Sequence, residues 1–248
     1  AGNETMSGAA CFAAEAALRM GAGLVKVLSD IQNRPVLQTK LPEILFGERK
    51  DLKESLNWCD CILFGPGVGV SEETKEMLEM ILDKGTKPLV IDADGLNTIS
   101  RYDMEINYPH GLILTPHLME AARLMSCDIA QMKEDLCQNA YDLAEKYHCI
   151  AVLKDAATIV AQEGDLVYIN QSGNDGMATG GSGDVLAGMI TGLLGGGLSV
   201  HEAAVHGVYL HGLAGDHARR DLGAYSMIAS DIITHIKDVT GGSYESVL

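Results

Sequence analysis

The most informative stretch of the sequence is a run of small residues followed by an acid. Residues 180–183 read Gly-Gly-Ser-Gly, Asp184 comes next, and the apolar residues after it recur at helical spacing as far as Leu194. Glycine allows the backbone to approach a ligand closely, and the first amides of a helix have no partner inside the helix. The stretch therefore predicts an anion site of the kind that holds a phosphate at the positive end of a helix dipole.

The acid at the end of this run needs a separate explanation, because a carboxylate beside a phosphate repels it. We expect Asp184 to take the proton from a hydroxyl that attacks the bound phosphoryl group. The alternative is that Asp184 is only a first-turn acid, which the helix dipole favours. The small residues that precede Asp184 favour the catalytic interpretation.

Composition limits the partners of the chain. Its 248 residues carry a net charge of −16, which disfavours nucleic acid, since that partner requires a basic face. A nucleotide can still bind if backbone amides and Mg²⁺ supply the positive field. No apolar run approaches the roughly 18 residues of a membrane span, and no signal peptide is visible. The six cysteines include no C-x-x-C pair, so we expect reduced thiols, a cytoplasmic location and no membrane partner.

Alternating strand and helix patterns predict an α/β fold with a mostly parallel sheet covered by helices on both faces. The predicted strands are 24–28, 35–39, 61–64, 88–91, 112–114 and 150–153. The predicted helices are 7–20, capped by Ser7, 51–58, 71–82, 118–125, 129–147, 185–194, 199–219 and 226–240. Thr158–Ala161 and Leu166–Ile169 are predicted to form a β-hairpin around Glu163, Gly164 and Asp165. We expect a single domain over residues 1–248.

Several polar turns follow predicted strands, and in such sheets ligands bind at the carboxyl ends of the strands. Residues 65–69 form a glycine-rich turn of this kind. Asp92 and Asp94 could hold Mg²⁺ through water, or one of them could cap the next helix. His117 could bind a polar substrate group, or it could cap its helix and pair with Glu120.

The remaining polar groups have weaker signals. Lys154 could reach a phosphate and Thr158 could donate to one, although a lysine here could equally lie in a surface loop. Three histidines and an acid occur on one predicted helix, and their spacing favours core packing over a metal site; they are His206, His211, Asp216 and His217.

Together these motifs resemble the ADP/ATP-dependent NAD(P)H-hydrate dehydratase family, a branch of the ribokinase-like superfamily. The matching segments are S-G-A-A (7–10), M-G-A-G-L-V (20–25), G-P-G-V-G (65–69), D-A-D-G-L-N (92–97), L-T-P-H (114–117) with Glu120, L-K-D-A-A-T (153–158) and N-D-G-M-A-T-G-G-S-G-D-V-L-A-G (174–188). They cover nearly the whole chain in family order, and the last string is highly specific. The resemblance implies a ribokinase-like three-layer sandwich with a late β-hairpin.

The resemblance also implies a reaction and its residues. The enzyme would dehydrate the 6-hydroxy hydrates NADHX and NADPHX by phosphorylating the hydroxyl with ADP or ATP, with Mg²⁺ bridging the phosphates. Asp184 would be the base, with the amides of Gly181, Ser182 and Gly183 as the anion hole. The implied nucleotide-binding residues are Lys154, Asp155, Ala156, Ala157, Thr158, Asn174, Met177 and Gly183. The implied substrate-binding residues are Ala9, Gly69, His117 and Asp184.

Two departures from the family pattern are visible. Asp155 stands where the family usually has glycine, and no strand precedes the first glycine-rich loop. We therefore expect a missing first strand, or a chain that is the C-terminal part of a longer one with a link to an NAD(P)H-hydrate epimerase. The family also implies a homo-oligomer, by precedent a tetramer. The alternatives are a ribokinase-like kinase for a vitamin-precursor alcohol and a catalytically silent nucleotide-binding module.

Overall fold

The computed structural model describes residues 1–164 and 167–241. Its main sheet has six strands in the order β3-β4-β5-β6-β7-β8. Strands β3 to β6 pair in parallel, and β7 and β8 pair antiparallel to their neighbours. The bounds are Ile62–Phe64 (β3), Leu89–Ile91 (β4), Leu112–Leu114 (β5), Ile150–Leu153 (β6), Ile159–Gln162 (β7) and Tyr168–Ile169 (β8). A separate parallel pair joins β1 (Lys26–Ser29) to β2 (Leu45–Glu48).

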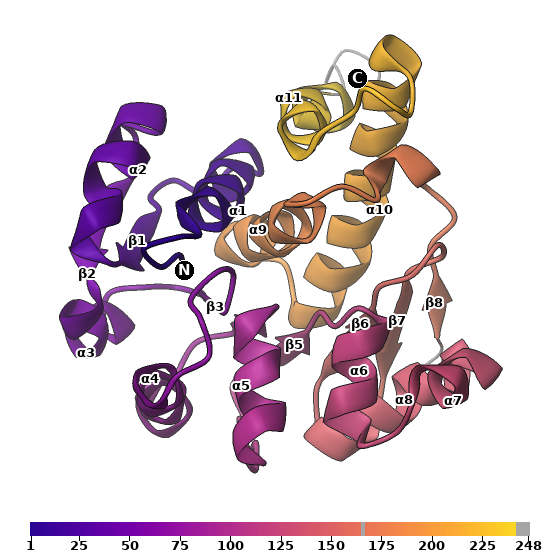
Figure 1. Ribbon diagram of the computed structural model, residues 1–248, viewed down its shortest axis with the longest axis horizontal. Helices are drawn as coiled ribbons and strands as arrows, with labels where there is room; N and C mark the ends of the chain where they lie inside the picture. The colour runs from indigo at the N-terminus through magenta and orange to yellow at the C-terminus, as the bar shows by residue number, and fades with distance from the viewer. Residues whose placement is uncertain (165–166, 242–248) are drawn as a thin grey trace.

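Helices cover both faces of this sheet (Figure 1). One face carries α1 (Ser7–Arg19), α9 (Ser182–Gly195), α10 (Val200–Leu222) and α11 (Ala229–Thr240). The other carries α3 (Leu52–Leu56), α4 (Glu72–Lys84), α5 (Asp94–Tyr102), α6 (Leu118–Met125), α7 (Ile129–Glu134) and α8 (Leu136–Tyr147), while α2 (Arg34–Lys40) lies beside β1 and β2. The expected α/β sandwich with a late hairpin is thereby confirmed.

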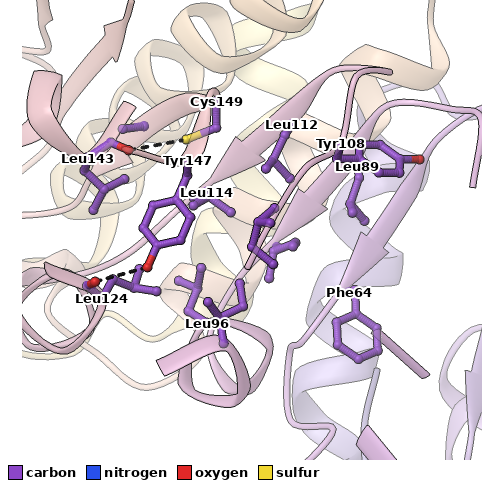
Figure 2. Packing of buried hydrophobic residues seen from close by; sticks show 14 of the residues in the cluster. Phe64, Leu89, Leu96, Tyr108, Leu112, Leu114, Leu124, Leu143, Tyr147 and Cys149 are labelled. Atoms are coloured by element: carbon purple, nitrogen blue, oxygen red, sulfur yellow. Dashed lines mark hydrogen bonds between the residues drawn. The ribbon is translucent and has the colours of Figure 1, made fainter. Parts of the chain in front are cut away.

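The alternation of side chains along the strands explains the two layers. Leu89 and Ile91 pack into the cluster beneath α4 to α8, whereas Val90 between them packs against α9 and α10. Because both faces are covered, successive residues of these strands are all apolar. Figure 2 shows the first cluster, in which the buried Tyr147 hydroxyl donates to the carbonyl of Leu124 at 3.0 Å.

Close packing of two small-residue helices fixes the start of α9. A Cβ added at Gly188 would lie 2.2 Å from the carbonyl oxygen of Ala13, and one added at Gly192 would lie 2.7 Å from that of Ala17. The backbones of α1 and α9 therefore touch where glycine faces alanine. This contact holds the small-residue loop before α9 in one place.

Some local predictions were wrong. Residues 35–39 lie in α2, not in a strand, and Pro35 occupies its first turn, where a missing N–H costs nothing. The sequence did not predict strand β2. Ser7 does not cap α1, which begins after Met6 without a side-chain cap.

Other predicted elements differ in their extent. The expected helix over 129–147 is two helices, because Asp135 adopts an extended backbone (φ −149°) and its carboxylate caps α8. The expected helix over 51–58 is only α3, preceded by a 3-10 turn over Arg49–Asp51. Asp165 and Leu166 of the predicted hairpin lie outside the described residues. Within the described part of the chain, no helix has both the length and the apolar character needed to cross a membrane.

Candidate active site

The loop before α9 presents main-chain amides. Gly181 has φ 93°, and a Cβ there would lie 2.6 Å from the ring of Phe12, so only glycine fits. The first helical hydrogen bond runs from the amide of Val185 to the carbonyl of Gly181 at 3.0 Å, and no side chain caps the helix. The amides of Gly183 and Asp184 in this first turn are therefore oriented as in an anion site.

A buried ion pair faces this loop. The ammonium of Lys154, directly after β6, lies 2.7 Å from the carboxylate of Asp92, directly after β4. A Cβ added at Gly183 would lie 3.3 Å from that ammonium and 3.9 Å from Asp92 Oδ2. The structure thus brings the predicted phosphate loop and the predicted nucleotide lysine together. It also gives Lys154 a partner, Asp92, that the sequence did not indicate.

The charges around Lys154 are unbalanced. Burial lowers the pKa of Lys154, but the negative charges of Asp92 and Glu120 raise it by more, so the net effect is a raised pKa. Burial is also the main cause that raises the pKa of Asp184 to about 7, and Asp92 raises it further while Lys154 lowers it. Burial likewise raises the pKa of Glu120. Asp184 therefore exchanges its proton near neutral pH, which suits a general base.

His117 caps α6. Its Nδ1 accepts hydrogen bonds from the amides of Met119 (3.1 Å) and Glu120 (3.3 Å), and Glu120 accepts one from the amide of His117 (2.9 Å). Burial lowers the pKa of His117, so the ring is neutral and Nδ1 carries no proton. The capping alternative is confirmed. The ring is still about half exposed, beside Lys154, and contact with a substrate stays a prediction.

The turn after β3 is held by Asp94. Asp94 Oδ2 accepts from the amide of Gly69 at 2.9 Å. Helix α5 begins at Asp94, and Ala93 before it (φ 48°) occupies the N-cap position without a side-chain cap. The predicted capping of α5 by Asp92 or Asp94 is therefore wrong. Ala9 lies against the same turn, because a Cβ at Gly67 would come within 2.9 Å of its methyl group.

The stretch that precedes the small-residue loop is anchored to α10. Asn174 caps the short 3-10 helix Asp175–Met177 and donates to Asp216 at 2.9 Å, and Asp216 also accepts from the amide of Gly173 at 3.0 Å. The side chain of Met177 packs on Gly215, where a Cβ would lie 2.2 Å from the sulfur. Sequence reasoning missed the role of Asp216, since nothing in the pattern connects position 216 to position 174.

The turn between β6 and β7 carries the rest of the predicted nucleotide-binding residues. Asp155 and Ala156 are exposed, and Ala157 and Thr158 are half-buried. They follow Lys154 directly, so the turn borders the ion pair and remains open to a ligand. The departure at Asp155 therefore places its acid at the surface.

His211 lies beneath the loop. Its Nε2 is 3.4 Å from the hydroxyl of Ser182, and burial lowers its pKa to about 4, so the imidazole is neutral. Across residues 1–164 and 167–241, no group of three or more His, Cys, Asp or Glu side chains could hold a metal ion. His211 is buried, as the core interpretation expects, whereas His206 on the same helix is exposed and that interpretation is wrong for it. Mg²⁺ often uses one or two carboxylates together with substrate phosphates. The carboxylates of Asp92 and Asp184 beside this loop therefore fit a Mg²⁺ brought with a nucleotide.

Comparisons with known proteins show what the chain is similar to. The chain is 40% identical over 240 residues to a bifunctional NAD(P)H-hydrate repair enzyme of Escherichia coli, covering 96% of this chain and 46% of the relative. It is 38% identical to an ADP-dependent (S)-NAD(P)H-hydrate dehydratase of Neisseria meningitidis, covering 93% of this chain and 80% of the relative. The chain therefore spans about half the length of the bifunctional relatives it matches.

Solved structures show the same fold. A ribokinase-like superfamily protein from Enterococcus faecalis superposes with a TM-score of 0.87 at 32% identity, covering 96% of this chain and 85% of the other. The ADP/ATP-dependent NAD(P)H-hydrate dehydratase of Bacillus subtilis, co-crystallised with ATP and Mg²⁺ and soaked with CoA, gives 0.86 at 26% identity, covering 97% and 88%. Residues 1–238 match the NAD(P)H-hydrate dehydratase family. The fold is ribokinase-like, and the chain belongs to the NAD(P)H-hydrate dehydratase family.

Proposed function

We propose that the chain uses ADP or ATP to convert the 6-hydroxy hydrates of NADH and NADPH back to NADH and NADPH. The observation that carries the proposal is the position of Gly183 and Asp184 at an uncapped helix start, opposite the ion pair of Lys154 and Asp92. A phosphoryl-transfer site needs main-chain donors, a cation and a base within one small region, and this region holds all three.

The proposed chemistry has two stages. Asp184 takes the proton of the C6 hydroxyl, and the oxygen attacks the terminal phosphoryl group, so an O–P bond forms and the bond to the leaving AMP or ADP breaks. The amides of Gly183 and Asp184 stabilise the developing charge. The C6–O bond then breaks, phosphate leaves, and loss of the C5 proton forms the C5=C6 double bond of the nicotinamide ring.

The supporting residues position the two substrates. Lys154 would hold the phosphates, with Thr158, Asn174 and Met177 near the nucleotide. Gly69, His117 and Ala9 would line the hydrate pocket. A bound Mg²⁺ would neutralise charge on the nucleotide phosphates, and the carboxylates of Asp92 and Asp94 would be its protein donors. Since the chain carries a net charge of −16, nucleotide affinity should fall strongly when Mg²⁺ is chelated.

The decisive experiment uses NADHX, ADP and Mg²⁺ with the chain as it stands. Absorbance at 340 nm should recover, with one phosphate and one AMP formed per NADH. A kinase for a vitamin-precursor alcohol would leave NADHX unchanged and would consume nucleotide only with its own alcohol. A silent module would bind nucleotide and turn over neither substrate, and either outcome overturns the proposal.

The cellular setting is a further proposal. A cytoplasmic location and a functional link to an NAD(P)H-hydrate epimerase are consistent with the bifunctional repair enzymes that the chain matches in part. We also expect a homo-oligomer, by family resemblance a tetramer. Light scattering of the purified chain tests that state directly.

A further inference from the structure

A polar cleft lies beside the catalytic centre. It has a volume of about 720 Å³, which is within the range of sites that bind small molecules. Three of the segments that line it are 29–32, 48–50 and 68–71, and they lie at or just beyond the carboxyl ends of β1, β2 and β3. We refer to it as the Arg49 cleft; its charged residues are Glu4, Asp30, Glu48, Arg49, Lys50 and Glu73.

The Arg49 cleft adjoins the catalytic centre at Gly69. Asp92 and Lys154 directly follow β4 and β6, so the centre and the cleft both lie at the carboxyl ends of parallel strands, where ligands bind in such folds. Gly69 lines the cleft, and its amide donates to Asp94 at 2.9 Å. Asp94 is close enough to Asp184 to raise the pKa of that carboxyl. A ligand that reacts at Asp184 can therefore extend past Gly69 into the cleft.

The substrate is longer than the space around Asp184. Each hydrate is a dinucleotide whose nicotinamide end reacts, so its adenosine half has to lie elsewhere on the protein. The phosphorylating nucleotide is assigned to Lys154 and the turn between β6 and β7. The Arg49 cleft lies at the opposite end of the main sheet, beyond β3 in the strand order. The two nucleotides therefore do not compete for one place.

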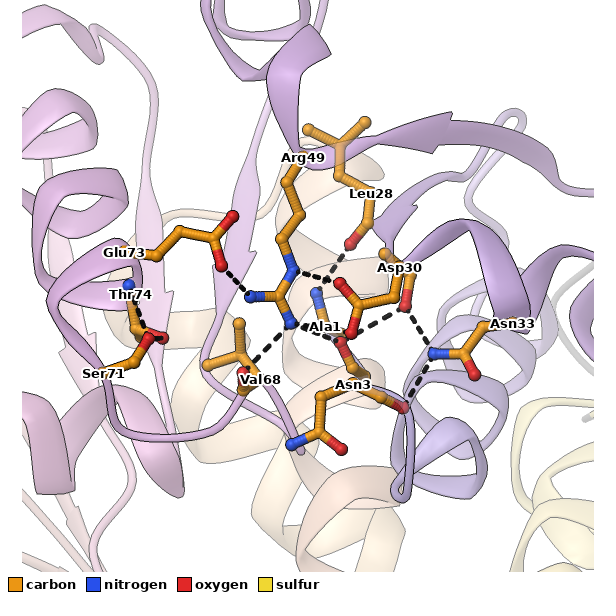
Figure 3. A network of polar contacts seen from close by, with 12 residues as sticks. Ala1, Asn3, Leu28, Asp30, Asn33, Arg49, Val68, Ser71, Glu73 and Thr74 are labelled. Carbon is orange, nitrogen blue, oxygen red and sulfur yellow. Dashed lines mark hydrogen bonds and ion pairs between the residues drawn. The ribbon is translucent and has the colours of Figure 1, made fainter.

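Both bases of the Arg49 cleft are paired with acids. The guanidinium of Arg49 lies 2.9 Å from Asp30 and 2.9 Å from Glu73 (Figure 3), and the ammonium of Lys50 lies 2.8 Å from Glu48. The four acids and two bases give the lining a formal charge of −2. A phosphate group would meet this negative field and would find both bases already engaged. The cleft therefore suits an uncharged polar group.

The adenosine ribose is the part in which the two hydrates differ. NADHX has a free 2′-hydroxyl there, and NADPHX has a 2′-phosphate. A carboxylate accepts a hydrogen bond from a hydroxyl and repels a phosphate. Dinucleotide sites of another fold place an acid beside the ribose of NAD and an arginine beside the 2′-phosphate of NADP. The charges of the Arg49 cleft follow the first pattern.

We propose that the Arg49 cleft binds the adenosine half of the hydrate and that its carboxylates select NADHX over NADPHX. The inference rests on the proposed function, because it names which of the two hydrates the same site prefers. Glu48 and Glu73 are 41% and 60% exposed, so water and salt screen their charges. The preference should therefore be about tenfold at low ionic strength, and not many orders of magnitude.

The first measurement compares kcat/KM of the wild-type chain for NADHX and NADPHX, with ADP and Mg²⁺ saturating and at low ionic strength. NADHX should be preferred by about tenfold. The preference should shrink as NaCl is raised to about 0.5 M, because salt screens the interaction between exposed charges.

The substitution Glu48→Gln tests the residues of the cleft. Glutamine keeps an oxygen that can accept from the amide of Asp51, as Glu48 does, but it releases the ammonium of Lys50 toward a 2′-phosphate. The preference for NADHX should fall by about 3- to 10-fold. The matched control is Glu79→Gln, which breaks a similar exposed pair with Lys75 at 3.8 Å outside the cleft. It makes the same change in net charge and should leave the preference unchanged.

Binding of the products tests the cleft without relying on the dehydration reaction. The Kd values of NADH and NADPH are measured by calorimetry with ADP and Mg²⁺ saturating, so that the nucleotide site is filled. NADH should bind about tenfold more tightly than NADPH, and Glu48→Gln should narrow the difference. If NADHX is not converted but this difference in Kd is present, the proposed function fails and the assignment of the cleft stands.

Three results would overturn the proposal. Equal Kd values for NADH and NADPH in the wild type would show that the cleft does not distinguish a hydroxyl from a phosphate. A preference that high salt leaves undiminished would be steric and not electrostatic. An equal effect of Glu48→Gln and Glu79→Gln would assign the preference to the net charge of the protein and not to the cleft.

Discussion

Two charged clusters in this protein differ in the number of acids around their cation and in the burial of those acids. In the first, the guanidinium of Arg49 contacts Asp30 at 2.9 Å and Glu73 at 2.9 Å (Figure 3). It also donates to the carbonyls of Gly2 and Val68. In the second, the ammonium of Lys154 lies 2.7 Å from the carboxylate of Asp92, and Glu120 and Asp184 lie near enough to act on it.

The difference separates a structural cluster from one suited to chemistry. Arg49 distributes its donors over acceptors from four segments of the chain, so the network joins the start of the chain to the turns after β1 and β3. Around Lys154 the acids Asp92 and Glu120 are buried. Burial is also the main cause that raises the pKa of Asp184 to about 7, and Asp92 raises it further. An unbalanced site gains most when a Mg²⁺-nucleotide brings positive charge and phosphate together.

The substitution Asp184→Asn is the strongest test of the conclusion that the second cluster is the one that carries out chemistry. Asparagine keeps the size and the helix start but cannot accept the proton, so kcat should fall by about 10²–10⁴-fold, as is usual when a general base is lost. Nucleotide Kd, measured by calorimetry with Mg²⁺, should change little. A variant that retains most of the wild-type kcat would show that Asp184 is only a first-turn acid.

Removing Arg49 should affect stability instead of chemistry. In Arg49→Met the carbonyls of Gly2 and Val68 lose a donor and Asp30 loses its cation, which should lower the free energy of unfolding by about 2–4 kcal/mol. Urea unfolding measures this change. The pH profile of kcat/KM should remain that of the wild type, and a shifted profile would contradict the structural assignment of the network.

Two substitutions in the second cluster should move the pH profile in opposite directions. Asp92 raises the pKa of Asp184 and Lys154 lowers it. Asp92→Asn should therefore shift the acidic limb of kcat/KM to lower pH, and Lys154→Met should shift it to higher pH. Lys154→Met should also raise the nucleotide KM by about 10- to 100-fold, since a charged hydrogen bond contributes about 1.5–3 kcal/mol. Shifts in the same direction would mean that another group controls the limb.

The sequence predicted which residues belong to the second cluster better than it predicted the contacts between them. Residues 180–184 and Lys154 stood out because small residues before an acid and a lysine at a strand end carry a local signal. The bond between Lys154 and Asp92 joins the ends of two strands 62 positions apart, and no local pattern encodes such a contact. The core strands were predicted well because parallel strands covered on both faces are continuous apolar runs.

The first cluster and its surroundings were not predictable in the same way. Arg49 lies in a 3-10 turn after β2, a strand whose exposed Leu45 and interior Gly47 give it no apolar pattern. Pro35 and the residues after it have strand-like composition, but tertiary packing makes them helical, with Leu37 fully buried. The conformation of a segment at the edge of the fold depends more on the elements it packs against than on its own residues.

The smallest expected effect is the loss of folding stability that the buried carboxylate of Asp184 causes when it ionises. Burial raises the pKa of the Asp184 carboxyl in the folded protein to about 7, well above its ordinary value in an unfolded chain. The folded state therefore holds this proton more tightly, and the stability it provides is present below about pH 4 and lost as the pH rises to about 7. Asp184→Asn never ionises, so its free energy of unfolding should match that of the wild type at pH 4. At pH 8 it should exceed the wild type by about 1 kcal/mol, because water partly screens the carboxylate. Calorimetry at the two pH values measures this difference in stability. Arg49→Met is the control, because its loss of stability relative to the wild type should be the same at pH 4 and pH 8. Equal Tm values for Asp184→Asn and wild type at pH 8 would mean that the ionised carboxylate does not destabilise the folded protein. The charges of the two clusters would then not explain the difference between them.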